Sequence, residues 1–179
     1  VILLNAAYRP GPMDFIPDIT SVKNGVKSPS YLVPEMQKIL GVTYGSAIYQ
    51  EQIMELFQMV GYSLGQSDII RRAMSKKHLN EIMAEKDRFE QGMIDKGAKP
   101  EDVEKFWTQL LAFASYAFNK AHAAAYSVVS YYTAWLKYYY PTEYMCALLQ
   151  YSPIEKYAQY TNDAMHMGVQ TLPPDINRS

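Results

Sequence analysis

Residues 69–77, IIRRAMSKK, carry four positive charges and no negative one. On a helix, Arg72 and Lys76 are neighbours at i and i+4, and like charges at this spacing cost about 0.2–0.5 kcal/mol unless an anion lies between them. Arginine forms paired hydrogen bonds to phosphate, and lysine supplies a compact charge. The segment is therefore a candidate polyphosphate-binding site composed of Arg71, Arg72, Lys76 and Lys77. The structural alternative is a solvated basic face at a helix C-terminus, where cations already favour the helix dipole.

A second candidate site lies in residues 118–141, FNKAHAAAYSVVSYYTAWLKYYYP. If Asn119 caps a helix here, the charge of Lys120 adds to the free backbone N–H groups of the first turn, and this combination binds phosphates. His122 and Tyr126 then share one helix face, where a hydrogen-bond donor beside a flat ring suits a sugar and its base. The structural alternative is an alanine-rich core helix with a buried, hydrogen-bonded histidine.

Two further segments give weaker signals. The proline loop YRPGPM holds Arg9 on a stiff backbone that can direct it toward a ligand, although an exposed arginine on a structural turn fits equally well. In GVTYGSAIYQEQIM, a turn or short strand precedes a helix, and the polar side chains at its start can bond either a ligand or the backbone. These side chains are Gln50, Glu51 and Gln52.

The motifs of several catalytic classes are absent from the sequence. It contains no GxxxxGK[ST], GxGxxG, HExxH or CxxC, and no pair of aspartates has the D-x-D spacing that commonly holds two catalytic metals. Asp163 and His166 stand at i and i+3, but two ligands do not make a metal site. We therefore expect a chain that binds phosphates, with no catalytic residue and no metal site of its own.

Composition and charge limit the kinds of protein that the sequence can encode. Of 179 residues, 49% are hydrophobic and 20% are charged, which argues against disorder, and the net charge of -1 excludes neither nucleic acid nor an acidic ligand. Charge is segregated, however, because no acidic residue occurs between Glu104 and Glu143. The single cysteine, Cys146, excludes an intramolecular disulfide framework and fits a reducing compartment, so we expect a cytoplasmic protein. No stretch is apolar and long enough to span a bilayer.

The elements that must position these side chains are predicted to be mainly α-helical. Five of the ten prolines lie in residues 10–34, which predicts an N-terminal loop with fixed turns, whereas few helix-breaking residues follow. Apolar residues at a period of 3.6 predict helices over residues 52–60, from Ser67 or Asp68 to 76, 80–94, from 100, 119–139, 141–150 and 153–168. Little strand is expected, around residues 45–50 and 169–172.

Five segments in one order carry a resemblance to a known family: YRPGPM, TYGSAIYQEQIM, GYSLGQSDIIRRAMSKK, FASYAFNKAHAAAYSVVSYYTAWLKYYYPTEYMCALL and LPPDINRS. From Tyr8 to Ser179 the sequence resembles the alpha subunit of bacterial DNA polymerase III, a family C replicative polymerase. The resemblance implies an irregular, multi-helix fingers domain. It further implies a loop region over 1–34, a helical core with nucleotide-facing motifs over 35–152, and a C-terminal helix with the PPDIN segment over 153–179.

The resemblance also assigns roles to residues. It implies that Arg71 and Arg72 reach the triphosphate of an incoming nucleotide, with Lys76 and Lys77 nearby on phosphate or DNA backbone. Arg9 belongs to the RPGP loop of the family and is a possible DNA or phosphate contact.

The segment that begins at residue 119 is implied to line the nucleotide pocket, through Asn119, Lys120, His122 and Tyr126. His122 would lie near the sugar or phosphates and Tyr126 near the base. The sequence departs from the family at Ala117, where glycine is usual, and at Ala121, where serine is usual. We expect the two basic segments to converge on one hollow sized for a triphosphate.

The function implied is that of the fingers domain of a replicative DNA-directed DNA polymerase, a nucleotidyltransferase that uses Mg²⁺ held by palm aspartates outside this chain. The chain alone is expected to be inactive. The implied partners are a deoxynucleoside triphosphate, template-primer DNA, the palm and other domains of the parent chain, and other subunits of the replicative complex, with no membrane. Two alternatives stay open: a non-catalytic helical nucleic-acid-binding module, and the same domain from an error-prone paralogue.

Overall fold

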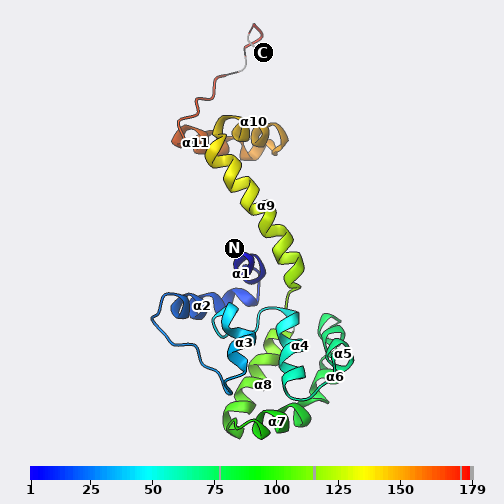
Figure 1. Ribbon diagram of the computed structural model, residues 1–179. Coiled ribbons are helices and arrows are strands. Elements are labelled where there is room, and N and C mark those ends of the chain that lie inside the picture. Colours follow the sequence, from blue (N-terminus) through cyan, green and yellow to red (C-terminus); the bar gives the residue numbers. More distant parts are fainter. Residues whose placement is uncertain (77, 115, 174, 178–179) are drawn as a thin grey trace. The chain divides into compact units, whose positions relative to one another are not determined.

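A computed structural model describes residues 1–76, 78–114, 116–173 and 175–177. In this described part, the chain forms eleven α-helices, three short 3-10 helices and no strand, which confirms the mainly α prediction (Figure 1). The chain divides into two compact units, Val1–Ser127 and Val128–Ser179. The boundaries expected after residues 34 and 152 separate functional regions and not compact units, so they stay predictions.

The N-terminal segment is not the plain loop that its prolines predicted. It forms α1 (Ile2–Ala7), the 3-10 helix η1 (Pro12–Phe15) and α2 (Ile16–Lys23). Pro12 is the first residue of η1, and Pro17 is the second residue of α2. Proline lacks an N–H group and has a fixed φ, so it disfavours the interior of a helix but suits its first turn.

The rest of the first unit is a succession of helices. They are α3 (Met36–Leu40), η2 (Gly41–Thr43), α4 (Gln50–Met59), α5 (Leu64–Ser75), α6 (Leu79–Met83), α7 (Lys86–Asp95) and α8 (Pro100–Ala114). The single helix predicted over residues 80–94 is wrong, because a turn at Ala84 and Glu85 separates α6 from α7. The strand expected over 45–50 is reduced to one parallel bridge, and the segment 169–172 contains no strand.

The start of α5 also differs from the prediction, which placed its cap at Ser67 or Asp68. The hydroxyl of Ser63 accepts a hydrogen bond from the backbone N–H of Gln66, and the side chain of Gln66 accepts one from the N–H of Ser63. This capping box satisfies two N–H donors at once and starts the helix four residues earlier than Ser67. Asp68 therefore lies inside α5, one turn before the arginines.

An aromatic cluster fixes α4 in the first unit. Phe57 of α4 lies 4.8 Å from Phe89 of α7, and Phe89 lies 5.3 Å from Trp107 of α8, measured between ring centroids. All three side chains are buried. In Figure 1, α4 lies among α3, α5 and α8. The packing of α4 in this core fixes the position of its first turn.

Helix α9 (Lys120–Tyr139) agrees with the predicted helix over 119–139 and crosses from the first unit into the second. The second unit continues with α10 (Pro141–Tyr151), the 3-10 helix η3 (Ile154–Lys156) and α11 (Tyr157–His166), so the helix predicted over 153–168 starts as a 3-10 turn. Among the described residues, no helix combines the length and apolarity needed to cross a membrane.

Candidate functional site

The start of α4 lies directly beside the start of α9. The backbone N–H of Phe118 donates to the carbonyl of Ile48 at 3.1 Å, and the N–H of Gln50 donates to the carbonyl of Phe118 at 3.0 Å. This pairing forms the bridge between Tyr49 and Phe118. It places the residue before the cap of α9 against the first turn of α4.

The end of α5 meets the same turn of α4. The side-chain Nε2 of Gln50 lies 3.1 Å from the Oγ of Ser75 and 3.3 Å from the carbonyl oxygen of Ala117. Ser75 is the last residue of α5, and its hydroxyl donates to the carbonyl of Arg71 at 3.0 Å. The basic end of α5 and the segment leading into α9 are therefore held on one turn of α4.

The two arginines share an anion within their own helix. The Nε of Arg71 lies 2.8 Å from Oδ1 of Asp68, and an Nη2 of Arg72 lies 2.8 Å from Oδ2 of the same carboxylate. The hydrogen bond from Arg71, with the charges of both arginines, lowers the pKa of Asp68. Asp68 therefore supplies an anionic partner for both arginines within the same helix, on the N-terminal side of Arg72 and not between Arg72 and Lys76. Arg72 is exposed, and several N–H donors of each guanidinium remain beyond these contacts.

Lys76 is exposed and caps the C-terminus of α5. Its position fits both a phosphate contact and the structural alternative of a solvated helix end. Lys77 lies outside the described residues.

The first turn of α9 is capped as predicted, but its N–H groups are not all free. The side-chain oxygen of Asn119 accepts the N–H of His122 at 2.9 Å, which confirms Asn119 as the cap. The N–H of Lys120 donates to the carboxylate of Glu51, at 3.1 and 3.2 Å from its two oxygens. An anion of the chain itself therefore lies at the helix start, where negative charge is favoured by the dipole. The side chain of Lys120 is exposed.

Three aromatic rings continue along α9 from its start. The ring of His122 lies 5.2 Å from Phe118 and 4.6 Å from Tyr126, measured between centroids. The side chains of His122 and Tyr126 are exposed, so the alternative of a buried core histidine is wrong. Ala123, on the neighbouring face, is fully buried. The helix thus packs through its small residues and presents its rings to solvent.

Arg9 is used to hold the segment before α9. Its Nε donates to the carbonyl of Ala6 at 3.0 Å, its Nη2 donates to the carbonyl of Tyr116 at 2.8 Å, and its guanidinium carbon lies 4.1 Å from the centroid of Phe118. Partial burial lowers its pKa. Arg9 is therefore not the exposed arginine on a turn that the structural alternative describes. A phosphate contact of Arg9 stays a prediction.

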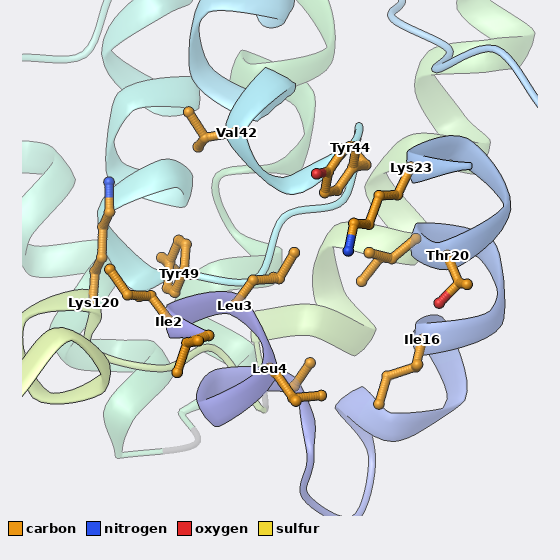
Figure 2. A pocket seen from close by; sticks show the side chains of 13 residues that line it. Ile2, Leu3, Leu4, Ile16, Thr20, Lys23, Val42, Tyr44, Tyr49 and Lys120 are labelled. Atoms are coloured by element: carbon orange, nitrogen blue, oxygen red, sulfur yellow. The ribbon is translucent and has the colours of Figure 1, made fainter. Parts of the chain in front are cut away.

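A hollow of about 510 Å³ is lined in part by Tyr49, before α4, and by Lys120, at the start of α9. Figure 2 shows Lys120 and Lys23 at opposite sides of this hollow, with Ile2, Leu3 and Leu4 of α1 between them. Most of its lining is apolar, and neither Arg71 nor Arg72 belongs to it. The two basic elements, which are the end of α5 and the start of α9, both contact the first turn of α4. Because neither arginine lines the hollow, it is not the shared triphosphate pocket that we expected.

The polar residues at the start of α4 divide into two groups. Gln52 is buried, and its side chain bonds the backbone N–H groups of Ile48 and Tyr49, each at 3.0 Å, and the hydroxyl of Thr43 at 2.7 Å. It therefore supports the turn from within. Gln50 and Glu51 instead reach α5 and α9. The sequence indicated that these side chains bond a ligand or the backbone, but it did not indicate which elements they join.

No group of three metal-ligating side chains lies close together in the described part of the chain. The Nδ1 of His166 lies 2.8 Å from the carbonyl oxygen of Asn162, which accounts for one of its two ring nitrogens.

Comparison with known proteins assigns the chain to a class. The family described as the bacterial DNA polymerase III alpha subunit finger domain matches residues 1–97, and the chain belongs to this family. The whole chain is similar to the DNA polymerase III subunit alpha of Thermus aquaticus at 45% identity and of Borreliella burgdorferi at 44%. It spans 15% and 16% of the length of these two relatives.

Proposed function

We propose that this chain is the part of a replicative DNA-directed DNA polymerase that binds the incoming deoxynucleoside triphosphate beside template-primer DNA. One observation carries the proposal: the first turn of α4 bonds both the basic end of α5, at Ser75, and the segment leading into α9, at Ala117 and Phe118. The family to which the chain belongs supports the same conclusion.

The phosphates would be bound mainly by Arg71 and Arg72, with Lys76, Lys77 and Lys120 adding positive charge. A triphosphate oxygen can take the place of the Asp68 carboxylate or occupy the guanidinium donors that Asp68 leaves open. A hydrogen bond to a charged group contributes about 1.5–3 kcal/mol, so two arginines supply much of the energy that positions the triphosphate. The exposed rings of His122 and Tyr126 then suit the sugar and the base.

The chemical step belongs to the parent enzyme. Mg²⁺ held by other domains would supply the activation of the primer hydroxyl and the stabilisation of the leaving pyrophosphate. The chain described here binds and orients. Alone it is predicted to be inactive, and primer extension by the purified 179-residue chain would contradict this.

The test is Arg72→Ala in the full-length parent polymerase. We expect a raised KM for nucleotide with little change in DNA affinity, because the arginine contacts the triphosphate. Lys27→Ala is a matched control, since it also removes an exposed positive charge paired with an aspartate and lies outside the site. Its KM should equal that of the wild type.

The competing function, a module that grips nucleic-acid backbone, gives a different result in the same experiment. If Arg72 contacts DNA phosphate, Arg72→Ala weakens DNA binding uniformly across sequences and reduces the slope of log K against log salt by about 0.9. KM for nucleotide then stays at its wild-type value, and the nucleotide-binding proposal is rejected.

A further inference from the structure

The side-chain amide of Gln50 connects the two basic elements through its N–H donors. Nε2 lies 3.1 Å from Ser75 Oγ at the end of α5 and 3.3 Å from the carbonyl oxygen of Ala117 before α9. We propose that Gln50 is a positioning residue, which sets the spacing between the basic end of α5 and the start of α9. This inference rests on the proposed function, because it concerns the same nucleotide.

The chemistry of the link requires an amide. Both atoms that face Nε2 are oxygens, and the hydroxyl of Ser75 already donates its proton to the carbonyl of Arg71. Ser75 can therefore only accept from Gln50, and the carbonyl of Ala117 can only accept. A primary amide supplies the two N–H donors that this arrangement needs, whereas a carboxylate at position 50 would place an acceptor against two acceptors.

The link continues to the side chains that are predicted to bind phosphate. The Ser75 hydroxyl bonds the carbonyl of Arg71, so movement of Ser75 moves the turn of α5 that carries both arginines. On the other side, Ala117 precedes the cap of α9 by two residues. A single side chain thus ties both halves of the candidate site to α4.

Gln50 acts away from the core that stabilises α4. The buried residues of this helix include Ile53, Leu56 and Phe57, whereas Gln50 is only half-buried and Ser75 is exposed. The backbone N–H of Gln50 is bonded separately, to the carbonyl of Phe118. Loss of the side-chain amide should therefore leave the fold intact and loosen only the spacing of the two basic elements.

The experiment measures KM for deoxynucleoside triphosphate, kcat and primer-template affinity in the full-length polymerase. Gln50→Met keeps the length of the side chain and removes both donors. We expect KM to rise about two- to tenfold, as for the loss of one or two hydrogen bonds, with DNA affinity unchanged. Ser75→Ala removes one of the two links and should raise KM by a smaller factor. Gln91→Met is the matched control, because the amide of Gln91 donates to Asp95 of its own helix, α7.

The combination with Arg72→Ala separates positioning from a general structural effect. If Gln50 acts by aiming α5, the Arg72→Ala effect on KM is smaller in the Gln50→Met background, whereas independent effects multiply. A wild-type KM for Gln50→Met, with a raised KM for Arg72→Ala, overturns this inference and leaves the proposed function standing. A wild-type KM for Arg72→Ala overturns the proposed function itself. If Gln50→Met does not fold, Ser75→Ala decides, and a wild-type KM for that variant overturns the inference.

Discussion

The guanidinium of Arg9 stacks on the ring of Phe118, with 4.1 Å between the guanidinium carbon and the ring centroid. Two hydrogen bonds of the same side chain, to the carbonyls of Ala6 and Tyr116, join the end of α1 to the segment that leads into α9. Arg9 is 107 residues distant from Tyr116 in the chain, so one side chain closes a long loop. The start of α9 is thereby fixed from two directions, by Arg9 and by the first turn of α4.

Arg9→Lys should destabilise the first unit although it keeps the charge. A lysine cannot make two divergent hydrogen bonds and stack on a ring at the same time. We expect a loss of about 1–2 kcal/mol in the free energy of unfolding, measured by urea denaturation of the 179-residue chain. Lys23→Arg is the control, because the side chain of Lys23 is exposed, and it should change stability little. Equal stability of Arg9→Lys and the wild type would show that the stacked geometry contributes nothing.

Substitution of alanine for glycine should raise the free energy of unfolding at one helical position and lower it at another. A Cβ at Gly92 of α7 would meet the Cβ and carbonyl oxygen of Val60 at 2.7 and 2.9 Å, whereas a Cβ at Gly65 of α5 meets nothing within 4 Å. Gly65→Ala should therefore stabilise the unit by about 0.5–1 kcal/mol, as expected for glycine in a helix. Gly92→Ala should destabilise it, because the backbone of Val60 must move. Stabilisation by both substitutions in urea denaturation would contradict the close packing of α7 on the end of α4.

The cap of α9 gives a test of how the helix start is stabilised. Asn119→Ala removes the acceptor for the N–H of His122 and should cost about 0.5–2 kcal/mol, while Asn119→Asp keeps an acceptor and should retain the stability. Denaturation of the same chain measures both. If Asn119→Ala leaves the free energy of unfolding unchanged, the hydrogen bond from the N–H of Lys120 to Glu51 is sufficient to stabilise the start of α9.

The pairing of Asp68 with the arginines should make a small, pH-dependent contribution to stability. Because the hydrogen bond from Arg71 lowers the pKa of Asp68 in the folded state, the contribution is present above the ordinary pKa of about 3.9 and is lost as pH falls through the lower, folded value. Thermal midpoints of the wild type and Asp68→Asn should differ at pH 6 and converge at acid pH. A difference that stays constant to the lowest pH would exclude this linkage.

Local signals predicted much of the fold. Helix α9 follows from Asn119, a strong cap, and from the absence of glycine and proline in residues 120–139 of the sequence. The start of α5 was misplaced because Ser63, Ser67 and Asp68 are all good capping residues, and the reciprocal bond with Gln66 selects Ser63. Prolines in the N-terminal segment were ambiguous for a similar reason, since proline suits both a turn and the first turn of a helix.

The site was predictable in its residue types but not in its internal contacts. The charges at Arg71 and Arg72 are visible in the sequence, and their shared partner Asp68 lies within one turn. The contact between Glu51 and the N–H of Lys120 spans 69 residues, and that between Gln50 and Ala117 spans 67. Neither contact produces a periodic pattern in the sequence, because each depends on how α4, α5 and α9 pack together.

The most direct test of the account is a crystal structure of the full-length polymerase with primer, template and an incoming nucleotide. We expect triphosphate oxygens within hydrogen-bonding distance of the guanidinium of Arg71 or Arg72 and also of Lys120, with the first turn of α4 between the two elements. A triphosphate that touches neither element, or that contacts only one while the other faces away, would contradict it.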